Sequence, residues 1–82
     1  SKPTRYVNLA NLYYKQENYE KALEHFVHAL ELDPYNVEYL STIADLSEQL
    51  SDIDRLMKTL KKLLDIDPYN YEVKRRLDKI QK

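Results

Sequence analysis

The chain has 82 residues, 43% of them hydrophobic and 33% charged, with a formal net charge of -1 at pH 7. Its length leaves room for one domain with a single modest core, and its balanced charge excludes the broad basic surface of a typical nucleic-acid-binding protein. The absence of cysteine excludes disulfides and cysteine metal sites, and the absence of glycine excludes glycine-rich phosphate-binding loops.

A recurring turn sequence divides the chain into repeats. The tetrapeptide Asp-Pro-Tyr-Asn occupies residues 33–36 and returns unchanged at residues 67–70, 34 residues later. That interval is the length of two short helices with their turns, so the recurrence predicts a small solenoid of stacked helical hairpins. The single domain 1–82 then comprises a first repeat at 3–36, a second at 37–70 and a remainder at 71–82.

The first repeat is predicted to be a pair of antiparallel helices, because only two or three residues connect its two amphipathic segments. The first helix, residues 3–16, carries an apolar stripe of Tyr6, Leu9, Ala10 and Tyr13. The second helix, residues 19–32, carries a stripe of Ala22, Leu23, Phe26, Ala29 and Leu30. Since the alanines are small, the two backbones are expected to approach closely.

The two corners are predicted to stop one helix and start the next. Pro34 disfavours helical geometry at the preceding residue and so ends the second helix. Asn36 is the predicted N-cap of the following helix, and Asn70 repeats this role at the second corner.

The second repeat is expected to form helices at 37–50 and 53–66. Leu56 and Leu63 stand where the first repeat has Ala22 and Ala29, so the second hairpin must either open or pack along a shifted seam. Residues 71–82 are predicted to form a fifth helix with a narrow apolar stripe. It should pack on the second hairpin and present its basic residues to water, as a terminal cap does. These residues are Lys74, Arg75, Lys79 and Lys82.

The first repeat resembles the tetratricopeptide repeat (TPR) family. In that family the first helix is marked by an aromatic residue, a leucine, a small residue and a tyrosine, and the second by alanine, an aromatic residue, alanine and proline. The matching residues are Tyr6, Leu9, Ala10, Tyr13, Ala22, Phe26, Ala29 and Pro34. The second repeat departs from the pattern, since Ser47 replaces the tyrosine. The resemblance implies an all-α fold, a right-handed α-solenoid of two hairpins and a C-terminal capping helix.

The resemblance also implies a protein-interaction module, without catalytic activity or cofactor, that belongs to a larger scaffold. Such modules bind an extended peptide or a helix in a concave groove lined by the first helix of each hairpin. The groove residues expected here are Val7, Asn8, Asn11, Tyr14, Lys15, Ser41, Asp45, Glu48, Arg75, Arg76 and Lys79, with Thr4, Glu38, Thr42 and Gln49 beside them. Tyr14 is the expected anchor, because an amphipathic aromatic side chain is cheap to immobilise.

Self-association is the alternative function. The second helix of the second repeat is apolar over a wide arc, and two repeats are fewer than the three that a solenoid usually needs. The interface of such a homodimer would contain Leu56, Met57, Leu60 and Leu63. In the competing interpretation, the fifth helix and the first hairpin cover this arc within one chain.

Acidic tails are a less suitable partner. Some TPR proteins clamp the acidic end of a chaperone through five positions, of which Asn11 and Arg76 match in type. Val7, Thr42 and Glu72 replace the expected lysine, asparagine and lysine, and Glu72 would repel a carboxylate. Such a tail is therefore not the expected ligand.

Metal, nucleic-acid and membrane partners are not expected. His25 and His28 are spaced i, i+3 on the outward side of their helix, but two histidines fall short of a closed zinc site. The basic residues of the fifth helix offer phosphate contacts without a base-reading motif. Since a cysteine-free chain suits a reducing compartment, the default expectation is a cytoplasmic protein.

Overall fold

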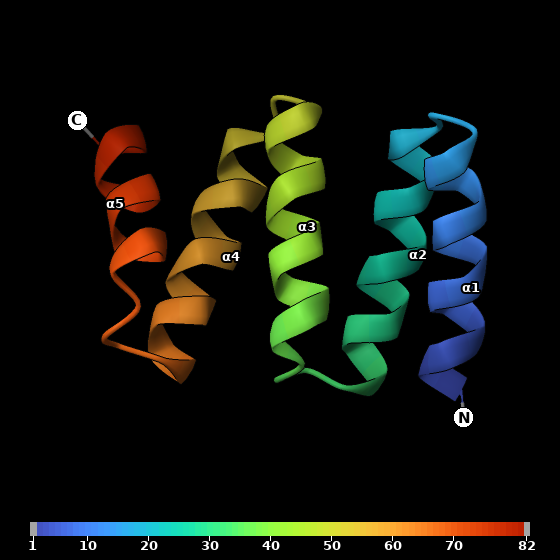
Figure 1. The fold of residues 1–82 in the computed structure, drawn as a ribbon, viewed down its shortest axis with the longest axis horizontal. Helices are drawn as coiled ribbons and strands as arrows, with labels where there is room; N and C mark the ends of the chain where they lie inside the picture. The colour runs from blue at the N-terminus through green and yellow to red at the C-terminus, as the bar shows by residue number, and fades with distance from the viewer. Residues whose placement is uncertain (1, 82) are drawn as a thin grey trace.

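A computed structural model describes residues 2–81, which form five α-helices and no strand. The helices are α1 (Lys2–Lys15), α2 (Tyr19–Leu32), α3 (Val37–Gln49), α4 (Ile53–Ile66) and α5 (Tyr71–Ile80). They stand side by side in chain order, in a body of 34 × 25 × 16 Å (Figure 1). The pairs that pack closely are neighbours in sequence, which is the arrangement of a solenoid. The predicted all-α fold of two hairpins and a fifth helix is confirmed.

Side-chain caps begin four of the helices. The predicted caps are confirmed: Asn36 Oδ1 accepts a hydrogen bond from the backbone N–H of Tyr39 at 3.0 Å, and Asn70 Oδ1 accepts one from Val73 at 3.1 Å. Asn18 and Asp52 cap α2 and α4 in the same way. Each hairpin turn and each corner between hairpins therefore ends in a residue that starts the next helix. No helix within residues 2–81 has the length and apolar character needed to cross a membrane.

The two turns inside the hairpins have the same geometry. After α1, the N–H of Asn18 donates to the carbonyl of Tyr13 and that of Glu17 donates to Tyr14, both at 2.9 Å. After α3, Asp52 and Ser51 make the equivalent bonds, at 2.8 and 3.1 Å. This pair of bonds defines a Schellman motif, which reverses the chain within a few residues. It accounts for the antiparallel packing of both hairpins.

The core consists of two apolar clusters that share α3. The first cluster joins the two hairpins and contains Ala10, Ala22, Leu23, Phe26, Ile43 and Leu46. The second joins the second hairpin to α5 and contains Leu40, Ala44, Leu56, Leu60, Leu63, Val73 and Leu77. Because α3 contributes to both clusters, it is the helix that ties the first repeat to the rest of the molecule.

The first hairpin packs closely through its alanines, as expected, since Ala10, Ala22 and Ala29 are completely buried. Two details of its prediction were wrong. Leu9 is exposed, because α1 packs against α2 alone among the described helices and no other helix covers it. His25 is not on the outward side of α2: its ring stacks on Tyr13 with 5.3 Å between the centroids.

The second hairpin is the more open of the two. Leu56 and Leu63 are buried, and fewer residues of α3 and α4 approach each other closely than residues of α1 and α2. In Figure 1 these two helices diverge away from their turn, and α5 lies beside α4. The added bulk of the two leucines is therefore accommodated by opening the hairpin, one of the two outcomes that the sequence predicted.

Small polar residues replace an aromatic pair inside the second hairpin. Ser47 and Thr59 stand one repeat after Tyr13 and His25, and both are buried. Thr59 Oγ1 donates to the carbonyl of Arg55 at 2.7 Å, whereas Ser47 Oγ has no hydrogen-bond partner among the described residues. The two repeats thus differ in the interior of the hairpin.

Candidate functional site

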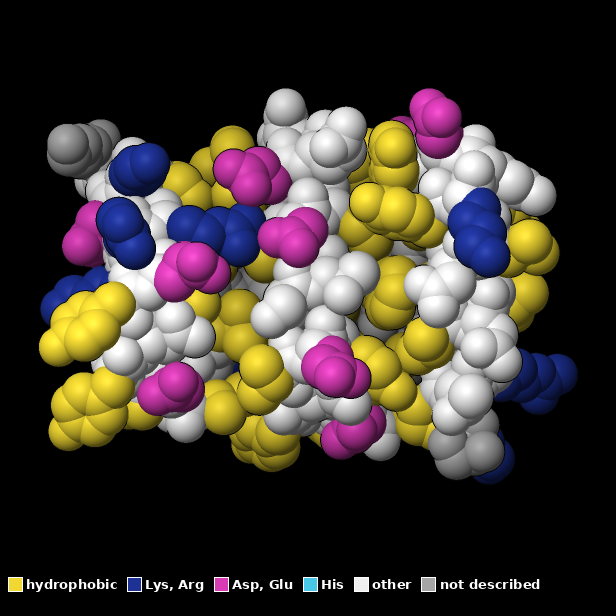
Figure 2. All heavy atoms as spheres, viewed as in Figure 1, with side chains coloured by type: hydrophobic (Ala, Val, Ile, Leu, Met, Phe, Trp, Pro, Cys, Tyr) yellow, Lys and Arg dark blue, Asp and Glu magenta, His cyan; other side chains and the backbone are white. Residues whose placement is uncertain are grey.

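A hollow of about 340 Å³ lies between the two hairpins, and residues of three helices line it. They are Asn11 and Tyr14 from α1, Tyr19 and Phe26 from α2, and Thr42, Asp45, Leu46 and Gln49 from α3. Figure 2 shows apolar side chains gathered in the gap between α1 and α3. Because Phe26 and Leu46 also belong to the core, the base of the hollow is fixed by packing.

Tyr14 combines a packed ring with an accessible surface. Its ring meets that of Tyr19 edge to face, with 5.4 Å between the centroids, and half of the residue's surface (50%) remains exposed. The contact restricts the ring while leaving part of it accessible. A restricted and accessible tyrosine loses little conformational entropy when a ligand covers it.

Asn11, Asp45 and Gln49 add polar groups to the lining of the hollow. Thr42 adds a hydroxyl whose hydrogen is already used, because Oγ1 donates to the carbonyl of Glu38 at 2.9 Å, so toward a ligand it can only accept. The amides of Asn11 and Gln49 can both donate and accept, and the carboxylate of Asp45 can only accept. The hollow thus combines an apolar base with several hydrogen-bonding groups, as binding sites generally do.

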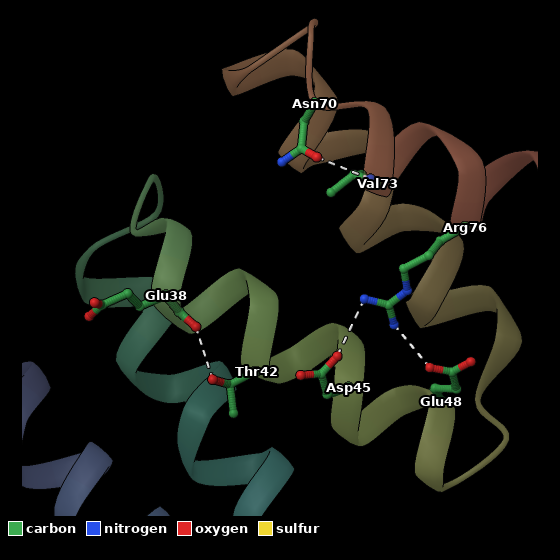
Figure 3. A network of polar contacts seen from close by, with 7 residues as sticks. All are labelled: Glu38, Thr42, Asp45, Glu48, Asn70, Val73 and Arg76. Carbon is green, nitrogen blue, oxygen red and sulfur yellow. Dashed lines mark hydrogen bonds and ion pairs between the residues drawn. The ribbon is translucent and has the colours of Figure 1, made fainter.

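Arg76 links α5 to the acidic side of α3. Its Nη1 lies 3.3 Å from Asp45 Oδ1, and its Nη2 lies 3.0 Å from Glu48 Oε1 (Figure 3). In Figure 2, basic side chains over α5 meet acidic ones over α3. The guanidinium of Arg76 is therefore already paired with carboxylates of its own chain.

The predicted groove residues are divided among several environments. Three of them, Asn11, Tyr14 and Asp45, line the hollow, and Glu48 and Arg76 form the ion-pair network beside it. Val7 packs against the core and is half-buried. The remaining residues are exposed on α1, α3 and α5 and do not line the hollow: Asn8, Lys15, Ser41, Arg75 and Lys79.

The sequence interpretation missed three lining residues. Tyr19 and Phe26 come from α2, whereas the expected groove is lined by the first helix of each hairpin, and Leu46 of α3 was not among the expected groove residues. The sequence showed Phe26 as part of the apolar stripe of α2, and so as a core residue. A stripe does not show that one edge of such a core side chain remains open to a hollow between helices.

The predicted self-association surface is not exposed in this fold. Leu56, Leu60 and Leu63 are buried in one cluster with Val73 and Leu77 of α5, and Met57 is half-buried against the same cluster. The fifth helix therefore covers the wide apolar arc of α4. Self-association through these four residues would require α5 to leave its place.

The two histidines lie near each other on α2. Besides stacking on Tyr13, His25 lies with its ring 6.4 Å from that of His28. His28 Nδ1 lies 3.3 Å from Glu31 Oε1. Within residues 2–81, no three or more metal-binding side chains gather in one place.

Two stacked helical hairpins, followed by a fifth helix and hollowed between their first helices, place the chain in the class of helical-repeat solenoids. Within that class, the chain belongs to the tetratricopeptide repeat family, because two family models of that description match residues 3–36 and 37–70. That family is a protein-interaction repeat, so the chain is a protein-interaction module.

A solved structure has the same fold at low sequence identity. It is described as the first TPR of Spaghetti (RPAP3) bound to the HSP90 peptide SRMEEVD. The two chains share 18% identity with a TM-score of 0.55, over 96% of this chain and 90% of the other. At this identity, the similarity concerns the fold.

Proposed function

We propose that the chain binds an extended peptide or a helix of a partner protein across the hollow between α1 and α3. The observation that carries this proposal is the half-exposed Tyr14 above a lining that contains Phe26 and Leu46. Sites for small ligands generally enclose about 300–1,000 Å³, so a hollow of about 340 Å³ is at the small end. It suits one apolar side chain of a longer ligand, whose backbone crosses the neighbouring helices.

The polar lining suits a peptide backbone. Asn11 and Gln49 offer amide groups on opposite helices, and both residue types can pair with a backbone N–H or carbonyl group. Asp45 accepts hydrogen bonds only, so it favours a ligand N–H or a cationic side chain. The ligand class supported by this arrangement is a peptide with an apolar anchor and a donor group close to it.

An acidic tail is disfavoured by the same geometry. Arg76 already contacts Asp45 and Glu48, so a ligand carboxylate would have to compete with two carboxylates of the chain. The HSP90 peptide in the similar structure has an acidic end, and this chain places Glu72 at one of the positions expected to hold such an end. We therefore expect a different peptide class.

The test is selection of binders from a displayed peptide library against the whole chain, followed by calorimetric titration of a selected peptide. Tyr14→Ala should weaken binding roughly tenfold or more, since tyrosines that a ligand buries at an interface are frequent hot spots. Tyr35→Ala is the matched control, because Tyr35 is exposed and lines a different hollow with Lys58, Lys61 and Lys62. Equal loss in the two variants, or none in Tyr14→Ala, would place the binding site elsewhere.

A further inference from the structure

The second hairpin and α5 use one set of positions to pack on the second helix of the hairpin before them. In α3, Ile43 and Leu46 are 1% and 2% exposed and share a cluster with Leu23 and Phe26 of α2. In α5, Leu77 and Ile80 occupy the same positions one repeat later and pack against the cluster of α4. Each of these helices thus presents an apolar pair to the second helix of the hairpin before it.

In α1, the same two positions hold Leu9 and Leu12, which are 39% and 53% exposed. Both side chains keep the apolar character of their counterparts, although no helix among the described residues covers them. Full burial of a leucine side chain contributes roughly 1.5–3 kcal/mol relative to exposure. We call this exposed pair on α1 the Leu9–Leu12 face. It has the same apolar positions as the interface between α3 and α2, one repeat earlier, but no described helix packs on it.

The opposite end of the stack is built differently. The positions that would face a further second helix are Lys74 and Asp78 of α5 and Gln81 directly after it, all exposed. Their counterparts in α3 are the buried Leu40, Ala44 and Ser47. At these positions α5 is polar where α3 is largely apolar, so a further second helix would find no apolar pair to pack on there.

The charges on α1 indicate what kind of helix could pack on the Leu9–Leu12 face. Helix α1 contains Lys2, Arg5 and Lys15 and no acidic residue. Arg5 stands at the third position of the face, where α3 has Tyr39 and α5 has the buried Val73. Two copies of α1 would bring like charges together, whereas a helix with carboxylates beside its apolar stripe would pair with them. The α2 sequence has this composition, with Glu20, Glu24 and Glu31 around its stripe.

We propose that the Leu9–Leu12 face docks the second helix of one further TPR-type hairpin, which carries an α2-like apolar stripe and a carboxylate that reaches Arg5. The docked hairpin stacks on α1 as the first hairpin stacks on α3. This proposal concerns a surface away from the hollow and does not rest on the proposed function.

The test extends the full chain by one additional copy of residues 3–36, joined ahead of residue 3 so that its second helix can reach α1. The extended chain should unfold in urea in one transition with a higher midpoint than the original chain. The methyl groups of Leu9 and Leu12 should lose contact with water, as measured by solvent-exposure NMR experiments. Two separate transitions, one at the original midpoint, would refute the docking.

A double variant, Leu9→Gln with Leu12→Gln, separates docking from a role within the original fold. It should lower the midpoint of the extended chain by at least twice its effect on the original chain. The control is Val37→Gln with Ile53→Gln, which changes two similarly exposed apolar residues elsewhere and should shift both chains alike. Equal effects of Leu9→Gln with Leu12→Gln on the two chains would overturn the proposal. It is equally overturned if the original chain is a dimer that this variant dissociates, since the occupant is then a second copy.

Discussion

Two residues hold a backbone conformation that glycine usually adopts. Glu17 and Ser51 have φ values of 59° and 58°, in the left-handed region, one repeat apart at the ends of α1 and α3. Both stand at the position of the Schellman motif where glycine is favoured, because a Cβ atom there crowds the neighbouring carbonyl oxygen. The chain contains no glycine, so both turns retain this unfavourable contact.

Replacing either residue with glycine should therefore stabilise the protein. For Glu17→Gly we expect the free energy of unfolding to rise by about 1 kcal/mol, and for Ser51→Gly by a similar amount, because the left-handed region costs other residues roughly 1–2 kcal/mol. Urea denaturation followed by circular dichroism measures both. The control is Gln16→Gly, next to the turn but without a positive φ, which should destabilise the helix end. The explanation fails if all three variants lose stability to the same extent.

Among the elements, α5 depends on two kinds of contact with the second hairpin. Val73 and Leu77 are buried in the cluster of α4, and Arg76 forms its two ion pairs with α3. Because the carboxylates of Asp45 and Glu48 are mostly exposed, solvent screens these pairs. The apolar contacts are thus expected to hold α5 in place, while the ion pairs set how it lies against α3.

A comparison of two variants tests this division. Arg76→Gln should lower the free energy of unfolding by at most about 1 kcal/mol, and the loss should diminish in 0.5 M salt, because exposed ion pairs contribute roughly 0.2–1 kcal/mol. Leu77→Ala should lower it by about 2–5 kcal/mol, with little dependence on salt. Urea denaturation at low and high salt measures both. A larger loss in Arg76→Gln than in Leu77→Ala would show that electrostatics hold the helix instead.

At the scale of the whole molecule, sequence periodicity predicted the fold well and the surface less well. The repeated corner and the alternation of helices and turns were enough for the five helices and the caps at Asn36 and Asn70, because these depend on local chemistry. The exposure of Leu9 was missed, because periodicity identifies an apolar stripe without showing whether another helix covers it. The contributions of Tyr19 and Phe26 to the hollow were missed for a related reason, since they depend on how two hairpins meet.

Because an apolar stripe does not show which helix covers it, the leucines of α4 suggested an interface between two chains. Their burial depends on α5, a helix whose narrow apolar stripe gives little sign of how much surface it covers. Residues 71–81 supply Val73, Leu77 and Ile80 to the cluster around Leu60 and Leu63. One helix therefore decides whether the apolar arc of α4 is internal or available to a second copy.

A chain that ends at residue 70 should self-associate. Without α5, the side chains of Leu60 and Leu63 lose their cover, and burying them against a second copy recovers roughly 1.5–3 kcal/mol for each fully buried leucine. Light scattering between micromolar and millimolar concentration should show a rising mass for the shortened chain and a constant mass for the full chain, with circular dichroism confirming that helices remain. As a control, Met57→Gln with Leu64→Gln in the shortened chain should reduce the association, since both residues border the uncovered cluster. A shortened chain that stays helical and monomeric would mean that the first hairpin closes over α4 unaided, and α5 would then not be the cover of this core.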